Sequence, residues 1–252
     1  MKFTINRDYL LEALNNVSRG LSVKTPMPVL TGIKIEAVNN TITLITTNRE
    51  ISVKVVLDRT DTNEVYEEGV CVVPGKYFID IIKKLEGKDV DFTLFEANTI
   101  KIISDRSTFT LIALDYTNFP NINFDVKSEP ITINSLKLKN FIKQTAFAAG
   151  VNESRLVLTG VCLETKQNDL QMIATDSYRL AKKISSSENT YPKTKIIIPS
   201  KSIEELSKIL EDESEDVKMS FANNRALFEY KNISFITRLI EGNFPDTSSI
   251  IP

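Results

Sequence analysis

Residues 29–33 read Val-Leu-Thr-Gly-Ile, and residues 157–161 repeat them as Val-Leu-Thr-Gly-Val. The two copies are 128 residues apart (157 minus 29), and the same offset aligns residues 3–6 with residues 131–134. Further along, residues 73–76 match 198–201 and residues 118–120 match 243–245, both at an offset of 125. A repeat of this length exceeds any solenoid unit, so the sequence predicts two duplicated domains.

Each half reads as a strand, an amphipathic helix and three strands, followed by the same order again. In the first half we expect strands at 2–5, 32–38, 41–46, 51–57, 69–73, 90–95, 99–103 and 108–114, with Asn39-Asn40 as a tight turn. Helices are expected at 7–19, from Gly75 to a stop at Gly87, at 138–149, and after a cap at Ser200 or Ser202. These helices are apolar on one side only, which predicts an α+β fold with the helices on a sheet face.

The segment 121–130 is polar and ends in a proline. Such a composition is typical of a linker. We therefore predict domains at residues 1–123 and 124–252.

Composition limits the class of protein. The 252 residues include 31 basic and 33 acidic side chains, a net charge of −2, which excludes a wholly basic nucleic-acid binder but not local basic faces. The sequence has no apolar run of membrane-spanning length and no signal-peptide core, so we expect a cytoplasmic protein without a membrane partner. Cys71 and Cys162 fall in separate apolar strands and are expected to be buried thiols.

The usual residues of catalysis are missing. The chain contains no histidine, and its two isolated cysteines cannot form a structural zinc site. Gly75-Lys76 does not complete a phosphate loop, because Gly69 is one residue too far away and Tyr77 replaces the Ser or Thr that would hold magnesium. We expect neither enzymatic activity nor a cofactor. The remaining enzymatic alternative is a hydrolase that pairs Asp176 with a distant glutamate.

Residues 174–180 read Ala-Thr-Asp-Ser-Tyr-Arg-Leu. The Thr-Asp-Ser turn follows an apolar run and should leave Tyr178, Arg179 and Leu180 at the rim of a sheet. The stretch by itself is equally typical of a polar hairpin turn.

Taken together, the motifs of this chain resemble those of the bacterial DNA sliding clamps, the family of the beta subunit of the replicative DNA polymerase III. The motifs that carry the resemblance are at residues 1–6, 28–32, 73–76, 157–160, 174–180 and 243–246. The resemblance covers the whole chain. It implies a DNA-clamp fold with helices on one side of curved antiparallel sheets. Family members have three domains per subunit and close as a homodimeric ring around duplex DNA; here the first two domains are expected and the third is absent.

The resemblance also implies a function and two sets of residues. A processivity factor of this family tethers the polymerase, the clamp loader and repair proteins through short hydrophobic peptide motifs. The residues implied for the partner-peptide pocket are Leu158, Thr175, Ser177, Tyr178, Arg179, Leu180, Pro245 and Ile250. The residues implied to face DNA are Lys24, Lys76, Asn152 and Lys201. The repeat relates the second set, since offsets of 128 and 125 carry Lys24 onto Asn152 and Lys76 onto Lys201, and DNA binding should be sequence-independent and weak.

Three features depart from the family pattern. Tyr178 stands where many relatives have histidine, Ser249 stands at a position that is usually basic, and the chain ends at Pro252 within an implied linker. The last feature leaves two alternatives. One is a truncated chain of the three-domain type, and the other is a natural two-domain clamp that closes as a homotrimer.

Overall fold

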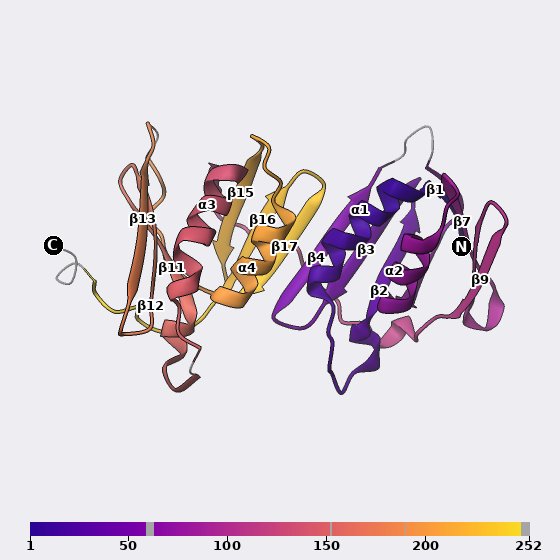
Figure 1. The fold of residues 1–252 in the computed structure, drawn as a ribbon, viewed down its shortest axis with the longest axis horizontal. Helices are drawn as coiled ribbons and strands as arrows, with labels where there is room; N and C mark the ends of the chain where they lie inside the picture. The colour runs from indigo at the N-terminus through magenta and orange to yellow at the C-terminus, as the bar shows by residue number, and fades with distance from the viewer. Residues whose placement is uncertain (59–62, 152, 189, 248–252) are drawn as a thin grey trace. The chain divides into compact units, whose positions relative to one another are not determined.

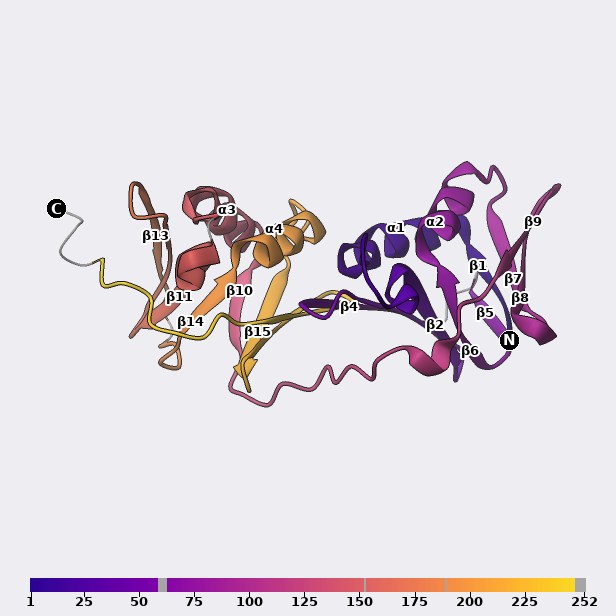
Figure 2. The same cartoon turned by 90° about the horizontal axis from the view of Figure 1, so that it is seen from below.

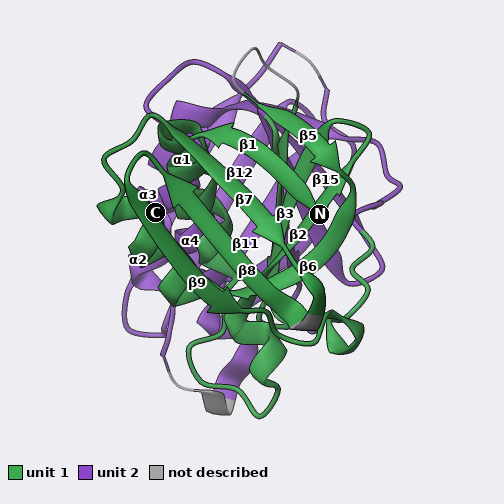
Figure 3. Cartoon of the chain, turned by 90° about the vertical axis from the view of Figure 1, so that its right-hand side faces the viewer, with its two compact units in different colours: residues 1–123, 232–235 green, residues 124–231, 236–252 purple. Residues whose placement is uncertain are grey.

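The computed structural model of the protein describes residues 1–58, 63–151, 153–188 and 190–247. Its internal contacts divide the chain into two compact units (Figure 3). Unit 1 comprises Met1–Asn123 with Asn232–Phe235, and unit 2 comprises Phe124–Lys231 with Ile236–Pro252. Each unit contains two α-helices that lie side by side against antiparallel strands (Figure 1).

Within unit 1 the hydrogen-bonded strands follow the orders β5-β1-β7-β8-β9 and β4-β3-β2-β6. Figure 2 shows both of its helices on the same side of the strands. The elements are β1 (Lys2–Asn6), α1 (Arg7–Val17), β2 (Gly32–Val38), β3 (Thr41–Thr47), β4 (Ile51–Leu57), β5 (Glu64–Glu67), β6 (Gly69–Pro74), α2 (Gly75–Lys84), β7 (Asp89–Leu94), β8 (Thr99–Ser104) and β9 (Ser107–Ile112).

Unit 2 repeats this plan with the strand orders β13-β12-β11-β14 and β10-β15-β16-β17, but the first three residues of β17, Ile233–Phe235, belong to unit 1. Its elements are β10 (Ile131–Asn134), α3 (Ser135–Thr145), the 3₁₀ helices η5 (Ala146–Ala148) and η6 (Glu153–Thr159), β11 (Gly160–Lys166), β12 (Asp169–Thr175), β13 (Leu180–Ser186), β14 (Lys195–Pro199), α4 (Ser200–Ile209), β15 (Asp216–Ala222), β16 (Arg225–Tyr230) and β17 (Ile233–Arg238).

The structural repeat follows the sequence repeat residue by residue. Helices α1 and α3 begin 128 positions apart, at residues 7 and 135, as do β2 and β11 at residues 32 and 160. Helices α2 and α4 begin 125 positions apart, at residues 75 and 200. The predicted α+β fold of two duplicated domains, with helices on one side of antiparallel strands, is therefore confirmed.

The core of unit 1 lies between the apolar faces of its helices and the inward-facing side chains of its strands. In α1 the apolar side chains Leu10, Leu14 and Val17 are fully buried, and Asn6 begins the helix by accepting hydrogen bonds from the first-turn amides. Three aromatic rings join this helix layer to the sheet. Phe92 stacks on Phe3 with ring centroids 4.7 Å apart, and Phe78 from α2 meets Phe92 edge to face at 6.0 Å.

Several predicted element ends were wrong. Helix α3 starts at Ser135 rather than at 138, because the Asn134 side chain accepts a hydrogen bond from the Lys137 amide and caps the helix earlier. The α-helix ends at Thr145 and continues only as the short η5. Strand β5 was missed, since its short and mostly exposed sequence lacks a clear alternation.

The predicted helix caps also need correction. Pro199, not a serine, occupies the N-cap of α4, and Ser202 is buried inside the helix. Helix α2 ends at Lys84, before Gly87. Gly87 instead allows a close backbone approach, because a Cβ there would lie 2.4 Å from the Ser104 Oγ atom. The predicted turn at Asn39-Asn40 is confirmed, with φ angles of 50° and 60°.

Both cysteines are buried free thiols, as expected. Burial raises the pKa of Cys71 to about 12 and that of Cys162 to about 11, so both stay protonated at neutral pH. In the part of the chain that the structure describes, no helix is long and apolar enough to cross a membrane. The same residues contain no cluster of three or more Asp, Glu, His or Cys side chains that could hold a metal ion.

Candidate partner-binding site

The turn between β12 and β13 is held by its own side chains. Thr175 donates from Oγ1 to the Arg179 carbonyl at 2.7 Å and accepts from the Ser177 amide at 3.1 Å. Asp176 Oδ1 accepts from the amides of Tyr178 and Arg179, both at 3.0 Å. Ser177 adopts a left-handed backbone with φ of 81°. The predicted turn at the sheet rim is therefore present, and local hydrogen bonds determine its shape.

Unit 1 contains the same turn. Thr47 donates to the Ile51 carbonyl at 3.0 Å and accepts from the Arg49 amide at 3.1 Å. Asn48 Oδ1 accepts from the amides of Glu50 and Ile51 at 3.0 and 2.8 Å. These side chain–backbone hydrogen bonds match one for one between the two turns at the offset of 128. The turns therefore differ in the side chains that they present outward.

Those side chains have opposite character. In unit 1, Ile51 is buried and Ser52 bonds Thr47 through their hydroxyl groups at 2.8 Å. At the matching positions of unit 2, Arg179 is exposed and Leu180 presents an only partly buried aliphatic side chain. The unit 2 turn thus combines an apolar wall with a charged rim, an arrangement suited to binding a peptide.

The rim arginine has a defined orientation. Its Nε donates to Asp176 Oδ2 at 3.0 Å, and its guanidinium carbon lies 5.9 Å from the centre of the Phe147 ring. Tyr178 beside it is 99% exposed and points away from the unit's core. Arg179 is therefore restrained by its neighbours while 57% of its side chain stays exposed to solvent.

The pKa of Asp176 is lowered below its ordinary value of 3.8, first by the amide of Tyr178, then by the amide of Arg179 and by the guanidinium. A lowered pKa in the folded state means that these bonds are fully present above the ordinary pKa. They are lost only as the pH falls through the lower, folded value.

We therefore expect the amide signals of Tyr178 and Arg179 to titrate with a midpoint below pH 3.8, measured by two-dimensional NMR. The unit 1 turn supplies an internal control, because Asn48 makes the same bonds without a titratable group. The amide of Ile51, which bonds Asn48 and has no titratable side chain, should not follow that titration. A midpoint at or above 3.8 for the unit 2 turn would contradict the assignment of its hydrogen bonds.

An apolar cluster lies beneath the rim. Its buried members are Cys162, Ile173, Ile197 and Phe244, with the partly buried Val157, Leu180 and Ile240 packed against them. The side chains come from η6, β11, β12, β13, β14 and the segment after β17. We call the turn 175–179 together with this cluster the candidate pocket.

The structure places the other predicted pocket residues at different depths. Leu158 is 6% exposed, and its carbonyl accepts from the Gly150 amide at 2.7 Å, so this side chain contributes little to the surface. Pro245 is exposed beside the buried Phe244. Ile250 lies outside the described residues. Within the predicted set, Thr175, Ser177 and Arg179 are joined by hydrogen bonds, and Leu180 belongs to the apolar cluster.

Sequence reasoning missed several side chains here. Phe147 contacts Arg179, and Arg155 Nη1 lies 3.4 Å from Ser177 Oγ. Phe244 stood in the repeated Asn-Phe-Pro motif, but its role as the aromatic member of the cluster needed the tertiary structure. The alternation of β11 and β12 could have indicated Cys162 and Ile173, because both lie on the same sheet face.

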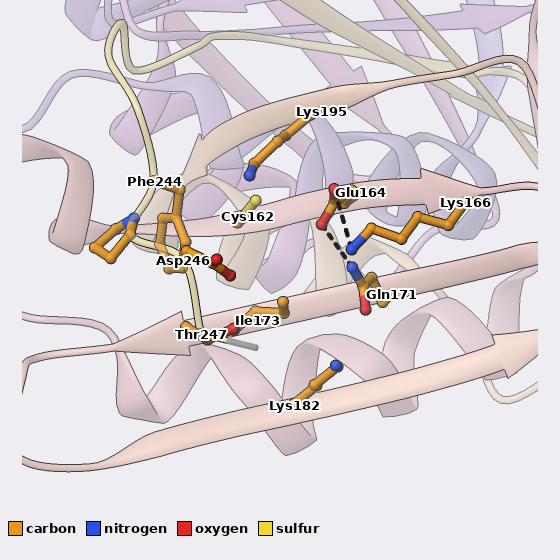
Figure 4. Close-up of a pocket in the computed structure, with 11 residues that line it drawn as sticks. Cys162, Glu164, Lys166, Gln171, Ile173, Lys182, Lys195, Phe244, Asp246 and Thr247 are labelled. Atoms are coloured by element: carbon orange, nitrogen blue, oxygen red, sulfur yellow. Dashed lines mark hydrogen bonds and ion pairs between the residues drawn. The ribbon is translucent and has the colours of Figure 1, made fainter. Parts of the chain in front are cut away.

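A small hollow adjoins the candidate pocket (Figure 4). Its volume is about 60 Å³. We call it the outer hollow; the residues that line it are Cys162, Glu164, Lys166, Gln171, Ile173, Lys182, Lys195, Phe244, Pro245, Asp246 and Thr247. Only Pro245 belongs to the pocket predicted from the sequence.

The predicted DNA-facing lysines are all exposed. Lys76 and Lys201 occupy the same place in the two units, the second residue of α2 and of α4. A cation in the first turn of a helix opposes the helix dipole, so these lysines do not serve helix stability. Lys24 lies in the loop after η1 (Ser18–Gly20), and Asn152 is outside the described residues.

Two family models match the chain. The DNA polymerase III beta subunit, N-terminal domain, matches residues 1–123, and the DNA polymerase III beta subunit, central domain, matches residues 132–246. Among curated proteins, a beta sliding clamp from Staphylococcus aureus (strain Mu50) is 40% identical over 256 residues. That alignment covers 100% of this chain and 68% of the relative.

Solved structures give the same result. A beta chain of DNA polymerase III from Streptococcus pneumoniae superposes with a TM-score of 0.95 at 37% identity, covering 100% of this chain and 68% of that one. A sliding clamp from Pseudomonas aeruginosa bound to griselimycin gives a TM-score of 0.92 at 27% identity, with coverage of 100% and 68%. By sequence and by fold, this chain belongs to the family of bacterial beta sliding clamps, the beta subunit of DNA polymerase III.

Proposed function

We infer that this protein is a DNA polymerase processivity factor that tethers partner proteins through the candidate pocket. The observation that carries the pocket assignment is the contrast between the two turns. Their hydrogen bonds are the same, yet only the unit 2 turn places an aliphatic side chain, Leu180, beside an oriented arginine, Arg179. Binding residues are often found on turns that a rigid scaffold positions, and the unit 2 turn is such a turn.

The partners fit the chemistry of this site. An apolar cluster with one cation at its rim suits a short peptide with Leu or Phe side chains and a polar flank. In sliding clamps such motifs belong to the polymerase catalytic subunit, the clamp loader and repair proteins, and we propose these as clients. The bound griselimycin in the Pseudomonas aeruginosa relative supports a ligand-binding role for this fold.

We propose that the protein is not an enzyme, because tethering partner proteins requires no catalytic residue. Asp176, the carboxylate considered for hydrolysis, is held by two amides and by Arg179, and the pKa of its carboxyl is lowered. A general acid needs a raised pKa, so Asp176 is better explained as a turn former.

A protein that works on bacterial DNA would act in the cytoplasm.

The DNA contribution is proposed from Lys24, Lys76 and Lys201. Lysine contacts with phosphates give sequence-independent, salt-sensitive affinity that permits sliding. A double variant with Lys76→Gln and Lys201→Gln should bind duplex DNA more weakly, with a salt slope reduced by about 2. An unchanged salt slope in an electrophoretic or fluorescence titration would contradict the assignment.

We further propose that residues 1–123 and 124–252 correspond to the first two clamp domains. Encircling DNA requires a closed ring, made either by longer subunits of the three-domain type as a homodimer or by three copies of a two-domain chain. Light scattering separates these proposals, because a stable mass of three chains favours the homotrimer.

The direct test of the pocket is a titration with a short fluorescein-labelled peptide that carries adjacent Leu and Phe residues between asparagine flanks. We expect saturable binding by fluorescence anisotropy. The same peptide with both apolar residues replaced by serine is the control and should not bind. Equal binding of the two peptides, or no binding of either, would contradict the proposed function.

A further inference from the structure

In unit 2, the pairing register of β13, β12, β11 and β14 places side chains in rows on one face of the sheet. The first row, at the candidate pocket, pairs Leu180 with Thr175. The second row contains Lys182, Ile173, Cys162 and Ile197, and the third contains Ile184, Gln171, Glu164 and Lys195. Side chains at paired positions share a sheet face, so the pocket continues directly onto the outer hollow.

The segment that follows β17 covers these rows. Phe244 is 6% exposed and packs with Cys162 and Ile173, and Leu180 belongs to the same apolar cluster. The segment 244–247 also borders the outer hollow (Figure 4). A peptide bound against Leu180 would therefore have this hollow within reach of a neighbouring side chain.

The charges in the outer hollow are uneven. Three ammonium groups, from Lys166, Lys182 and Lys195, face two carboxylates, from Glu164 and Asp246. Glu164 is already engaged, because it accepts from Gln171 Nε2 at 2.6 Å and lies 3.6 Å from Lys166 Nζ. The hollow retains a net positive charge beside its apolar floor.

We propose that the outer hollow is a carboxylate subsite of the partner-binding site, which receives an Asp or Glu side chain flanking the client's apolar residues. Lys182 and Lys195 supply the cations. The volume of about 60 Å³ exceeds the roughly 10–15 Å³ that one water molecule needs, so the hollow can admit a carboxylate group. This subsite rests on the proposed function, because the apolar residues of the peptide anchor it in the candidate pocket.

The test compares three peptides with the same adjacent Leu and Phe residues, flanked on one side by asparagines, aspartates or lysines. A second set carries the flank on the other side, so that both chain directions are sampled. On the full chain at low salt, one aspartate peptide should bind about two- to fivefold more tightly than its asparagine counterpart, and the lysine peptide more weakly. The preference should vanish near 1 M salt, where the screening length falls to about 3 Å.

Matched variants identify the cations. A Lys182→Glu/Lys195→Glu double variant should reverse the preference toward the lysine peptide, measured relative to the asparagine peptide on the same variant. Lys183→Glu is the control, because Lys183 pairs with Met172 in the register and points to the opposite sheet face from Lys182. It should leave the preference intact.

The outcomes separate the two hypotheses. If no peptide binds, the proposed function fails and the subsite fails with it. If all peptides bind equally, the pocket stands and the subsite is wrong. If Lys183→Glu has the same effect as the double variant, the preference reflects the overall charge of the unit, which also overturns the subsite.

Discussion

Replacing Phe78 by alanine should lower the free energy of unfolding of unit 1 by about 3–5 kcal/mol. Phe78 is fully buried at the contact between α2 and the sheet, and its ring meets Phe92, which in turn stacks on Phe3. The substitution removes the edge-to-face contact and leaves a cavity that a β-sheet cannot close without distortion. A loss of this size is a large part of the roughly 5–15 kcal/mol that stabilises a domain.

Native-state hydrogen exchange measures this effect for each unit separately. Protection of the Val90 and Phe92 amides in β7 should fall, while protection in β15 of unit 2 should change less. Tyr77→Ala is the control, since Tyr77 neighbours Phe78 on the same helix but is 65% exposed, and it should cost within about 0.5 kcal/mol. Equal protection in the Phe78 and Tyr77 variants would contradict the role assigned to this aromatic group.

Leu180→Asp should weaken binding of the neutral Leu-Phe peptide about 10- to 100-fold. Burying one aliphatic side chain of the client against Leu180 is worth about 1.5–3 kcal/mol, and a carboxylate in its place would have to lose its hydration for the peptide to bind. Leu180 is a better probe than Leu158, which is 6% exposed, because a charge at Leu158 would disturb the fold as well as the site.

Ile184→Asp is the matched control for Leu180. It introduces the same charge on the same face of β13, two rows further from the turn, at a side chain that is 48% exposed. Its affinity for the neutral peptide should equal that of the unchanged chain, and circular dichroism should show both variants folded. If a folded Leu180→Asp protein binds as well as the Ile184→Asp protein, the candidate pocket has been misplaced.

Much of the site could be predicted because the repeat provided two versions of the same local pattern. The Thr-Asp-Ser turn depends on side chains that bond backbone groups a few residues away, so residues 175–179 contained the information for their own shape. The comparison with residues 47–51 likewise required only the sequence offset. The apolar faces of the helices could be predicted for the same reason, since residues three and four apart in a helix lie on the same side.

The failures share the opposite cause. Strand β5 and the Pro199 cap of α4 carry weak local signals, and their conformations depend on packing against distant parts of the chain. The outer hollow could not be predicted from the sequence, because it depends even more strongly on contacts between distant parts of the chain. Glu164, Lys182 and Phe244 are far apart in sequence and become neighbours only through strand pairing and through the path of the chain after β17.

The duplicated order of strands and helices and the turn that carries Arg179 and Leu180 could be predicted from the sequence, because both depend on local periodicity or on hydrogen bonds within a few residues. The family could be predicted from the motifs that recur along the whole chain. The tertiary structure was needed to establish which side chains surround that turn, how deeply Leu158 is buried and which lysines of β13 and β14 line the outer hollow. Those properties depend on the register between strands, where a shift of one residue would turn every side chain to the other face of the sheet.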